Sequence, residues 1–334
     1  MLRAFRLGVL AAGLFGIAAA ATLAAGAGRQ MDNSRDLAPE LAAYARERFR
    51  AGDLTAALRV RRRLLGLALH GSGRAALPPA TAMTDLARVY IEMQRYLDAE
   101  PLLLAARRDL LDHAEPHNPA LVPILCGLAR IARARGDGAA AHKWAAEAVA
   151  LAVRAGRQGN SYHAEALRAL GGALVMQKRF AQGARVLRRA LTLDRAADGK
   201  AGPMTARDLA ALGVLDLRQK RFAAALPLIE RAALLDQARL GPTHPLIADD
   251  YHELGLAELG LGRPGEAAAA LRFAIWVLVR GEGRGSARLA YTELTLARAL
   301  HEEGKGQKAG LLFDDAQKIL GKAERREHRR QRQT

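Results

Sequence analysis

Small side chains recur along this sequence at a constant spacing of 42 residues, and this spacing constrains the fold more than any other feature. One series consists of Ala57, Ala99, Ala141, Gly183, Ala225, Ala267 and Ala309. Twelve residues before each member stands another small residue: Ala45, Ala87, Ala129, Gly171, Gly213, Gly255 and Ala297. Seven residues after each comes a third series: Leu64, Ala106, Ala148, Ala190, Ala232, Ala274 and Ala316. Such a period predicts a solenoid of stacked units, each burying its apolar face against its neighbours.

Each unit reads as two helices joined by a short turn. In the last unit but one, Tyr251, Leu254 and Glu258 fall at helical spacing. The glycines between 262 and 265 interrupt that helix, and the helical period resumes at Ala267. Small residues twelve apart are needed where two antiparallel helices cross, because no larger side chain fits between their backbones. The sequence therefore predicts a helical hairpin in every unit.

The unit also carries a family resemblance. A leucine precedes the small residue of the first helix in six units, and an aromatic such as Phe180 or Phe222 stands three residues before the small residue of the second. In these features the chain resembles the tetratricopeptide repeat proteins. Its 42-residue period, and the segment from Gly241 to Pro245 before a repeat, resemble the kinesin light chain subgroup. The resemblance implies an all-α, right-handed solenoid of about seven hairpins over residues 38–320, with a linker at 28–37 and a basic tail at 321–334.

One departure from that subgroup concerns peptide binding. Kinesin light chain repeats carry asparagines just before the leucine and small pair, where their side chains hold the backbone of a bound peptide. The corresponding positions of this chain contain no asparagine; they are Asp85, Gly127, Ala169, Ala211, Glu253 and Thr295. The resemblance therefore does not imply motor cargo binding, and any peptide is expected to be held differently.

The amino-terminal segment resembles a secretory signal. Arg3 and Arg6 precede an uncharged run from Leu7 to Gly28, and small residues before Gly28 fit cleavage after Ala27. Residues 1–27 are thus expected to be a signal peptide, or a retained anchor formed by residues 7–27. Both readings predict export, to the periplasm or beyond the cell. A mitochondrial presequence is the remaining alternative, weakened by the absence of serine from this run.

No catalytic or metal-binding pattern stands out. His113 and His117 have helical metal-ligand spacing, but Pro116 and Pro119 place them in a loop between units. Cys126 is the single cysteine, so no internal disulfide is possible, and its position favours an inert, half-buried thiol. We expect a non-enzymatic protein with no cofactor, no metal and no small-molecule substrate.

Candidate binding residues follow from the resemblance, which implies that the first helix of each unit lines a concave groove. The arginines expected in the first half of the groove are Arg46, Arg88, Arg130 and Arg133, and the apolar anchors expected in the second half are Val175, Val214, Leu217, Leu256 and Leu259. Guanidinium groups match carboxylates, so this surface predicts a protein or peptide partner with an acidic segment. The alternative is that the arginines only solvate the surface and the apolar residues pack between units.

The formal net charge of +17 points to acidic partners without identifying them. Such charge also suits a second class of function, an envelope or membrane-surface component that binds anionic lipids or polymers while the groove is incidental. Aromatic residues make up only 4% of the chain and form no base-stacking motif, so specific nucleic-acid binding is not expected.

Overall fold

A computed structural model of the chain describes residues 37–70, 78–113, 118–156, 160–281 and 283–331. Within these ranges fourteen helices form seven hairpins, and no strand occurs. The first four hairpins are α3 (Ala38–Arg50) with α4 (Leu54–His70), α5 (Pro79–Glu92) with α6 (Tyr96–His113), α7 (Leu121–Ala134) with α8 (Gly138–Arg154), and α9 (Asn160–Met176) with α10 (Phe180–Asp198). The last three are α11 (Pro203–Arg218) with α12 (Phe222–Leu240), α13 (Pro245–Gly260) with α14 (Pro264–Gly281), and α15 (Ala287–Glu302) with α16 (Gly306–Gln331).

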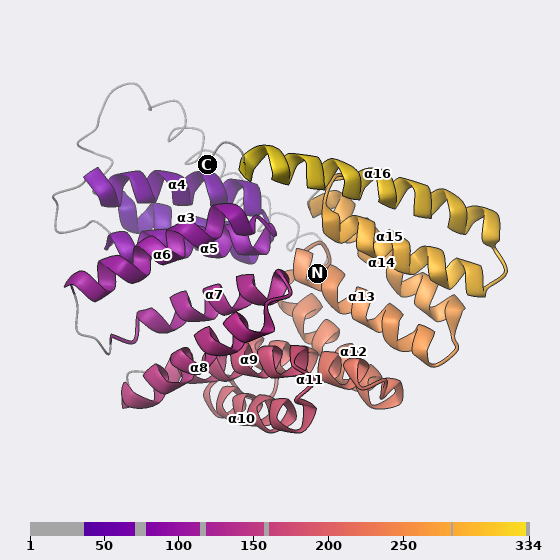
Figure 1. The fold of residues 1–334 in the computed structure, drawn as a ribbon, viewed down its shortest axis with the longest axis horizontal. Coiled ribbons are helices and arrows are strands. Elements are labelled where there is room, and N and C mark those ends of the chain that lie inside the picture. The colour runs from indigo at the N-terminus through magenta and orange to yellow at the C-terminus, as the bar shows by residue number, and fades with distance from the viewer. Residues whose placement is uncertain (1–36, 71–77, 114–117, 157–159, 282, 332–334) are drawn as a thin grey trace, which may run out of the picture.

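The hairpins stack into an all-α solenoid that curves through almost a full ring (Figure 1). From α5 onward, successive odd-numbered helices contact one another and form the inner layer, while the even-numbered helices lie outside them. The predicted fold class is therefore confirmed. The tail expected at 321–334 is, as far as Gln331, a continuation of the last helix. The expected signal segment, residues 1–27, lies outside the described residues.

The small residues lie where the sequence placed them, at the helix crossings. Ala57, Ala99 and Ala225 are fully buried, and every member of the three series is buried. In three units the first helix carries glycine, because a leucine or isoleucine of the second helix fills the space. A Cβ atom on Gly255 would lie only 2.6 Å from Cγ of Leu271. The period of 42 residues is therefore the distance along the chain between successive points at which two helix backbones cross.

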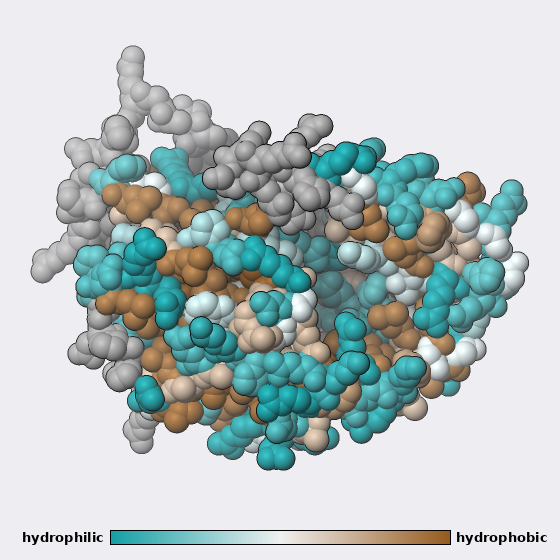
Figure 2. Space-filling model, in the orientation of Figure 1, coloured by the Kyte–Doolittle hydropathy of each residue, from teal (hydrophilic) through white to brown (hydrophobic). Residues whose placement is uncertain are grey.

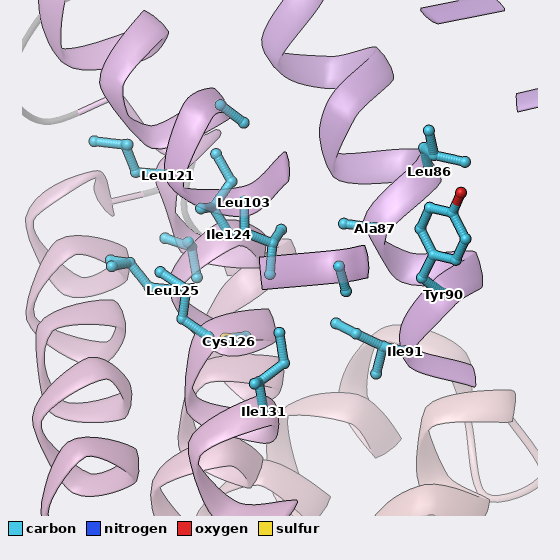
Figure 3. Close-up of a cluster of buried hydrophobic side chains, with 14 of the residues drawn as sticks. Leu86, Ala87, Tyr90, Ile91, Leu103, Leu121, Ile124, Leu125, Cys126 and Ile131 are labelled. Atoms are coloured by element: carbon cyan, nitrogen blue, oxygen red, sulfur yellow. The ribbon is translucent and has the colours of Figure 1, made fainter. Parts of the chain in front are cut away.

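Most of the buried apolar surface joins neighbouring hairpins. One continuous group of side chains extends from α4 through α9 and includes Leu103, Ile124 and Leu125, each at most 1% exposed (Figure 3). Cys126 belongs to this group and is 6% exposed, deeper than the half-buried thiol expected from the sequence. Burial raises the pKa of its thiol well above 9, so the group is neutral and unreactive.

The turn within each hairpin has one repeated backbone geometry. Its left-handed residue recurs every 42 positions, at Gly52, Gln94, Gly136, Lys178, Lys220, Gly262 and Gly304. The next residue donates a backbone hydrogen bond to the carbonyl five positions back, as Arg95 does to Tyr90 at 2.8 Å. This arrangement ends the first helix and reverses the chain, as left-handed helix caps do generally.

Candidate functional site

The inner helices bring charged side chains of several hairpins together around the axis of the ring; we call the surface that they line the central channel. Figure 2 shows this face hollowed near its middle, with mostly hydrophilic atoms inside the hollow. Other faces of the inner helices pack on their partner helices and on adjacent hairpins. Charge in the channel therefore comes from residues far apart in the sequence.

Two arginines of the expected set are exposed. Arg46 is an exposed residue of α3. Arg88, also exposed, lies over the ring of Phe49 with 5.5 Å between the guanidinium carbon and the ring centroid. The guanidinium group of Arg88 therefore lies on an aromatic face and remains exposed.

Arg130 is instead engaged within the chain. Its two terminal nitrogens bond both carboxylate oxygens of Glu92, with Nη1 to Oε1 at 2.6 Å and Nη2 to Oε2 at 2.9 Å. Such a bidentate pair is among the strongest charge-assisted contacts in proteins. The single row of free arginines that the sequence suggested is thus interrupted at Arg130.

Arg133 and Arg218 are two further exposed arginines on the inner helices. Arg133, one turn beyond Arg130, lies against Gly172, where a Cβ atom would overlap its guanidinium. Arg218, at the end of α11, is close enough that its charge lowers the pKa of Arg133, although burial contributes more. Among the described residues, neither forms a hydrogen bond or ion pair. These two groups can accept an anion without first losing a partner.

The apolar candidates divide into two groups. Leu259 is 4% exposed and packs with Ala267, Leu296 and Leu300, so its side chain belongs to the core between hairpins. Val175 packs against Leu187 and Leu215 and is only partly exposed. Val214, Leu217 and Leu256 are half-buried on the inner helices, where part of each side chain remains open to contact.

Sequence reasoning expected Asp85 and Glu92 to offset part of the positive charge of the groove, but it gave no role to the acidic groups of α13. Glu253 and Asp249 lie on α13, and Arg288 forms an ion pair with Asp249 at 3.4 Å. Burial and then the charge of Asp249 raise the pKa of Glu253 to about 7, although Arg218 opposes the shift. Only the period could have signalled these residues, because Glu253 occupies a position where related repeats carry asparagine.

The described part of the chain contains neither a candidate metal site nor a candidate membrane-spanning helix. No group of three or more His, Cys, Asp or Glu side chains there is arranged to hold a metal ion. Searched over the same residues, no helix has the length and apolar character needed to cross a bilayer.

The fold and the channel define a class, that of helical-repeat solenoids with a charged inner surface. Residues 210–275 match the tetratricopeptide repeat family. Seven hairpins of the same form surround that segment, so the whole solenoid is similar in fold to tetratricopeptide repeats. No curated protein sequence matches it significantly.

Solved structures share the fold at low sequence identity. BtubC (BKLC) from P. vanneervenii superposes with a TM-score of 0.54 and 20% identity, covering 70% of this chain and 92% of that one. A putative kinesin light chain from Podosopora anserina gives 0.50 and 20%, covering 64% and 100%. Aspartyl phosphate phosphatase F from Bacillus subtilis gives 0.56 and 14%, covering 82% and 68%.

Proposed function

We propose that the protein is a non-catalytic adaptor that holds an acidic segment of a protein partner in its central channel. The observation that carries this proposal is the excess of guanidinium groups there. Arg88, Arg133 and Arg218 are exposed, and the acids that accompany them are few. Val214, Leu217 and Leu256 add half-buried apolar contacts beside these charges. Fixed cations in a concave surface attract and orient carboxylates more strongly than the same charges on a convex one.

Charge reversal inside and outside the channel tests the adaptor function. In the double variant Arg133→Glu, Arg218→Glu, two free cations become anions, and we expect affinity for the partner to fall at least a hundredfold. The matched control is Arg185→Glu, Arg188→Glu, which makes the same charge change at two exposed positions of the outer helix α10. Arg130 is left intact, because reversing it would place two glutamates together.

The partner itself can be found by crosslinking in intact cells followed by capture of the protein. Binding of the captured partner to purified protein is then compared among the wild type and both double variants. The proposal fails if the outer-helix variant loses the partner while the channel variant, still folded by circular dichroism, retains it.

A second candidate function rests on the outer surface. Arg185, Arg188 and Arg189 are exposed together on α10, and the whole chain carries a formal net charge of +17. Binding to anionic lipids or polymers through such surfaces would be steeply salt-dependent and insensitive to the channel variant. Cosedimentation with vesicles containing phosphatidylserine, at low and high salt, separates this function from the adaptor function.

We further propose that the protein acts outside the cytoplasm, after export directed by residues 1–27. The expected product begins at Gly28 and is lighter than the full chain by about 2.7 kDa, at about 0.1 kDa per residue. Mass spectrometry of the extracytoplasmic fraction measures this directly. A full-length protein in washed membranes would indicate an anchor instead, and a full-length cytoplasmic protein would refute export.

A further inference from the structure

Glu92 is a buried carboxylate on an inner helix. It is the last residue of α5 and is 7% exposed. Its side chain forms the bidentate pair with Arg130, and its backbone carbonyl accepts a hydrogen bond from Arg288 at 3.3 Å. One residue thus joins α5 to α7 and to α15, which belong to three different hairpins.

Further positive charge surrounds the same carboxylate. Burial alone would raise the pKa of Glu92, but the charges of Arg130, Arg207 and Arg288 outweigh it and hold that pKa well below its usual range. Arg207 lies on α11, and its charge is not matched by an ion pair with any described residue. Arg130 thus bonds the carboxylate itself, and Arg288 bonds the backbone carbonyl of the same residue while its side chain also pairs with Asp249. Arg207 acts on the carboxylate through its charge.

The repeat gives no structural reason for an acid at this position. The equivalent residues of the other units are Arg50, Ala134, Met176, Arg218, Gly260 and Glu302. A hairpin of this type therefore forms with a basic, acidic, apolar or absent side chain here. Glu92 is therefore explained by its contacts with arginines of other hairpins, and not by packing within its own hairpin.

We propose that Arg130, Arg207 and Arg288 form a carboxylate-binding site, and that Glu92 fills it in the free protein as an internal competitor for an acidic partner segment. The inference rests on the proposed adaptor function and adds its regulation. A carboxylate from a partner that replaces that of Glu92 keeps Arg130 paired. The exchange costs the loss of the partner of a buried Glu92 carboxylate, so the internal pair selects against weakly acidic or singly charged ligands.

The test measures whether removing the internal carboxylate strengthens binding of an external one. The probe is a fluorescently labelled decaglutamate peptide, followed by anisotropy against the full-length protein at low salt. Glu92→Gln preserves the shape of the side chain and the backbone bond to Arg288, and we expect it to bind the probe about tenfold more tightly than the wild type. Glu147→Gln, on the exposed surface of the outer helix α8, removes the same charge and should change affinity less than twofold.

Two further variants identify the site. Adding Arg207→Gln to Glu92→Gln should abolish the gain, whereas adding Arg188→Gln on the outer helix should preserve it. If Glu92→Gln does not fold, Glu92→Asp takes its place, because the shorter acid weakens the bidentate pair and should give a smaller gain. A folded variant that binds no tighter than the wild type would overturn the inference, as would a gain that survives the loss of Arg207.

Failure of this inference differs from failure of the adaptor function. The decaglutamate experiment reports only on the competition at Arg130, Arg207 and Arg288. The channel-reversal experiment reports on the natural partner. A gain with decaglutamate and no partner loss in the channel variant would uphold the site while refuting the adaptor function.

Discussion

At the scale of single residues, the small side chains carry most of the information about the fold. Ala225 lies at the crossing of α11 and α12 and is fully buried, as the 42-residue period predicted. The period is visible because a backbone crossing tolerates only Ala or Gly. Polar residues of the channel follow no such period, because a side chain in contact with water can be replaced by many others without a packing cost. The pair between Glu92 and Arg130 could therefore not be derived from the sequence.

Replacing Ala225 with leucine should destabilise the protein. The added atoms enter a crossing without free space, and we expect the free energy of unfolding to fall by about 1–3 kcal/mol. Ala224→Leu is the matched control, because Ala224 precedes it on the same helix and is exposed. Equal denaturation midpoints for the two variants would contradict the assigned helix phase.

Glu253 should make stability depend on pH. Its pKa is raised from 4.5 to about 7 by burial and by Asp249, so the folded state binds its proton more tightly than the unfolded state. Stability from this group is present below about pH 4.5 and is lost as the pH rises through 7. Glu253→Gln should therefore stabilise the protein by about 1–3 kcal/mol at pH 8, and by much less at pH 5. Thermal melts at both values measure the difference, and a gain of equal size at both would exclude Glu253 as its source.

At the scale of helices, two neighbouring interfaces between hairpins have the same arrangement of charged residues, except that one residue differs. Arg168 bonds Asp194 at 2.6 Å and Asp208 at 2.7 Å between the fourth and fifth hairpins. The equivalent positions 42 residues later in the chain hold Ala210, Asp236 and Asp250. Asp236 pairs with Arg239 at 3.0 Å, but Oδ2 of Asp250 is buried without a hydrogen-bond partner. The second interface thus keeps the buried acids and lacks their arginine.

Ala210→Arg should restore the missing cation and stabilise the fifth and sixth hairpins. Burial, followed by Asp236 and other acids, raises the pKa of Asp250 well above 3.8, so this carboxyl now costs free energy at high pH. We expect a gain of about 1–3 kcal/mol at pH 8, measured by urea denaturation. Ala223→Arg, on the exposed face of α12, should have no such effect. A destabilised Ala210→Arg variant would show that the interface has no room for the side chain.

The left-handed backbone geometry of the turns could be predicted from the sequence only in part. Four of the seven left-handed positions hold glycine and were readable as breaks, as at Gly262. The other three hold Gln94, Lys178 and Lys220, which do not suggest a positive φ angle. Their geometry follows from the packing of the two helices, which fixes the path of the connection between them.

At the scale of the whole molecule, the ring brings together hairpins that are distant in the chain. His244, just before α13, lies against the turn after α3, with 3.4 Å between its Nε2 and the carbonyl oxygen of Phe49. Arg288 contacts Glu92 in the same way between the seventh and second hairpins. The period predicted contacts only between neighbours. Closure depends on small rotations added over many units, which no single repeat encodes.

Gly52 allows the closing contact to be tested. A Cβ atom there would lie 2.9 Å from Cδ of Pro245, whereas at the equivalent Gly136 it would meet nothing within 4 Å. Both residues have positive φ angles, 76° and 82°, so replacement of either imposes similar backbone strain of about 1–2 kcal/mol. Gln94 shows that this turn accepts a glutamine. Gly52→Gln should therefore widen the ring, while Gly136→Gln should cost stability alone.

Small-angle X-ray scattering measures the widening as a larger radius of gyration, and thermal melts measure the shared strain. We expect Gly52→Gln to be the less stable of the two, because it also loses the packing of His244 and Pro245 on the first hairpin. Opening the ring should also move Arg288 away from the carboxylate site, while Glu92 stays paired with Arg130. Gly52→Gln should accordingly bind decaglutamate less tightly than Gly136→Gln does. Identical scattering curves for the two variants would show that the first and sixth hairpins do not hold the ring closed in solution.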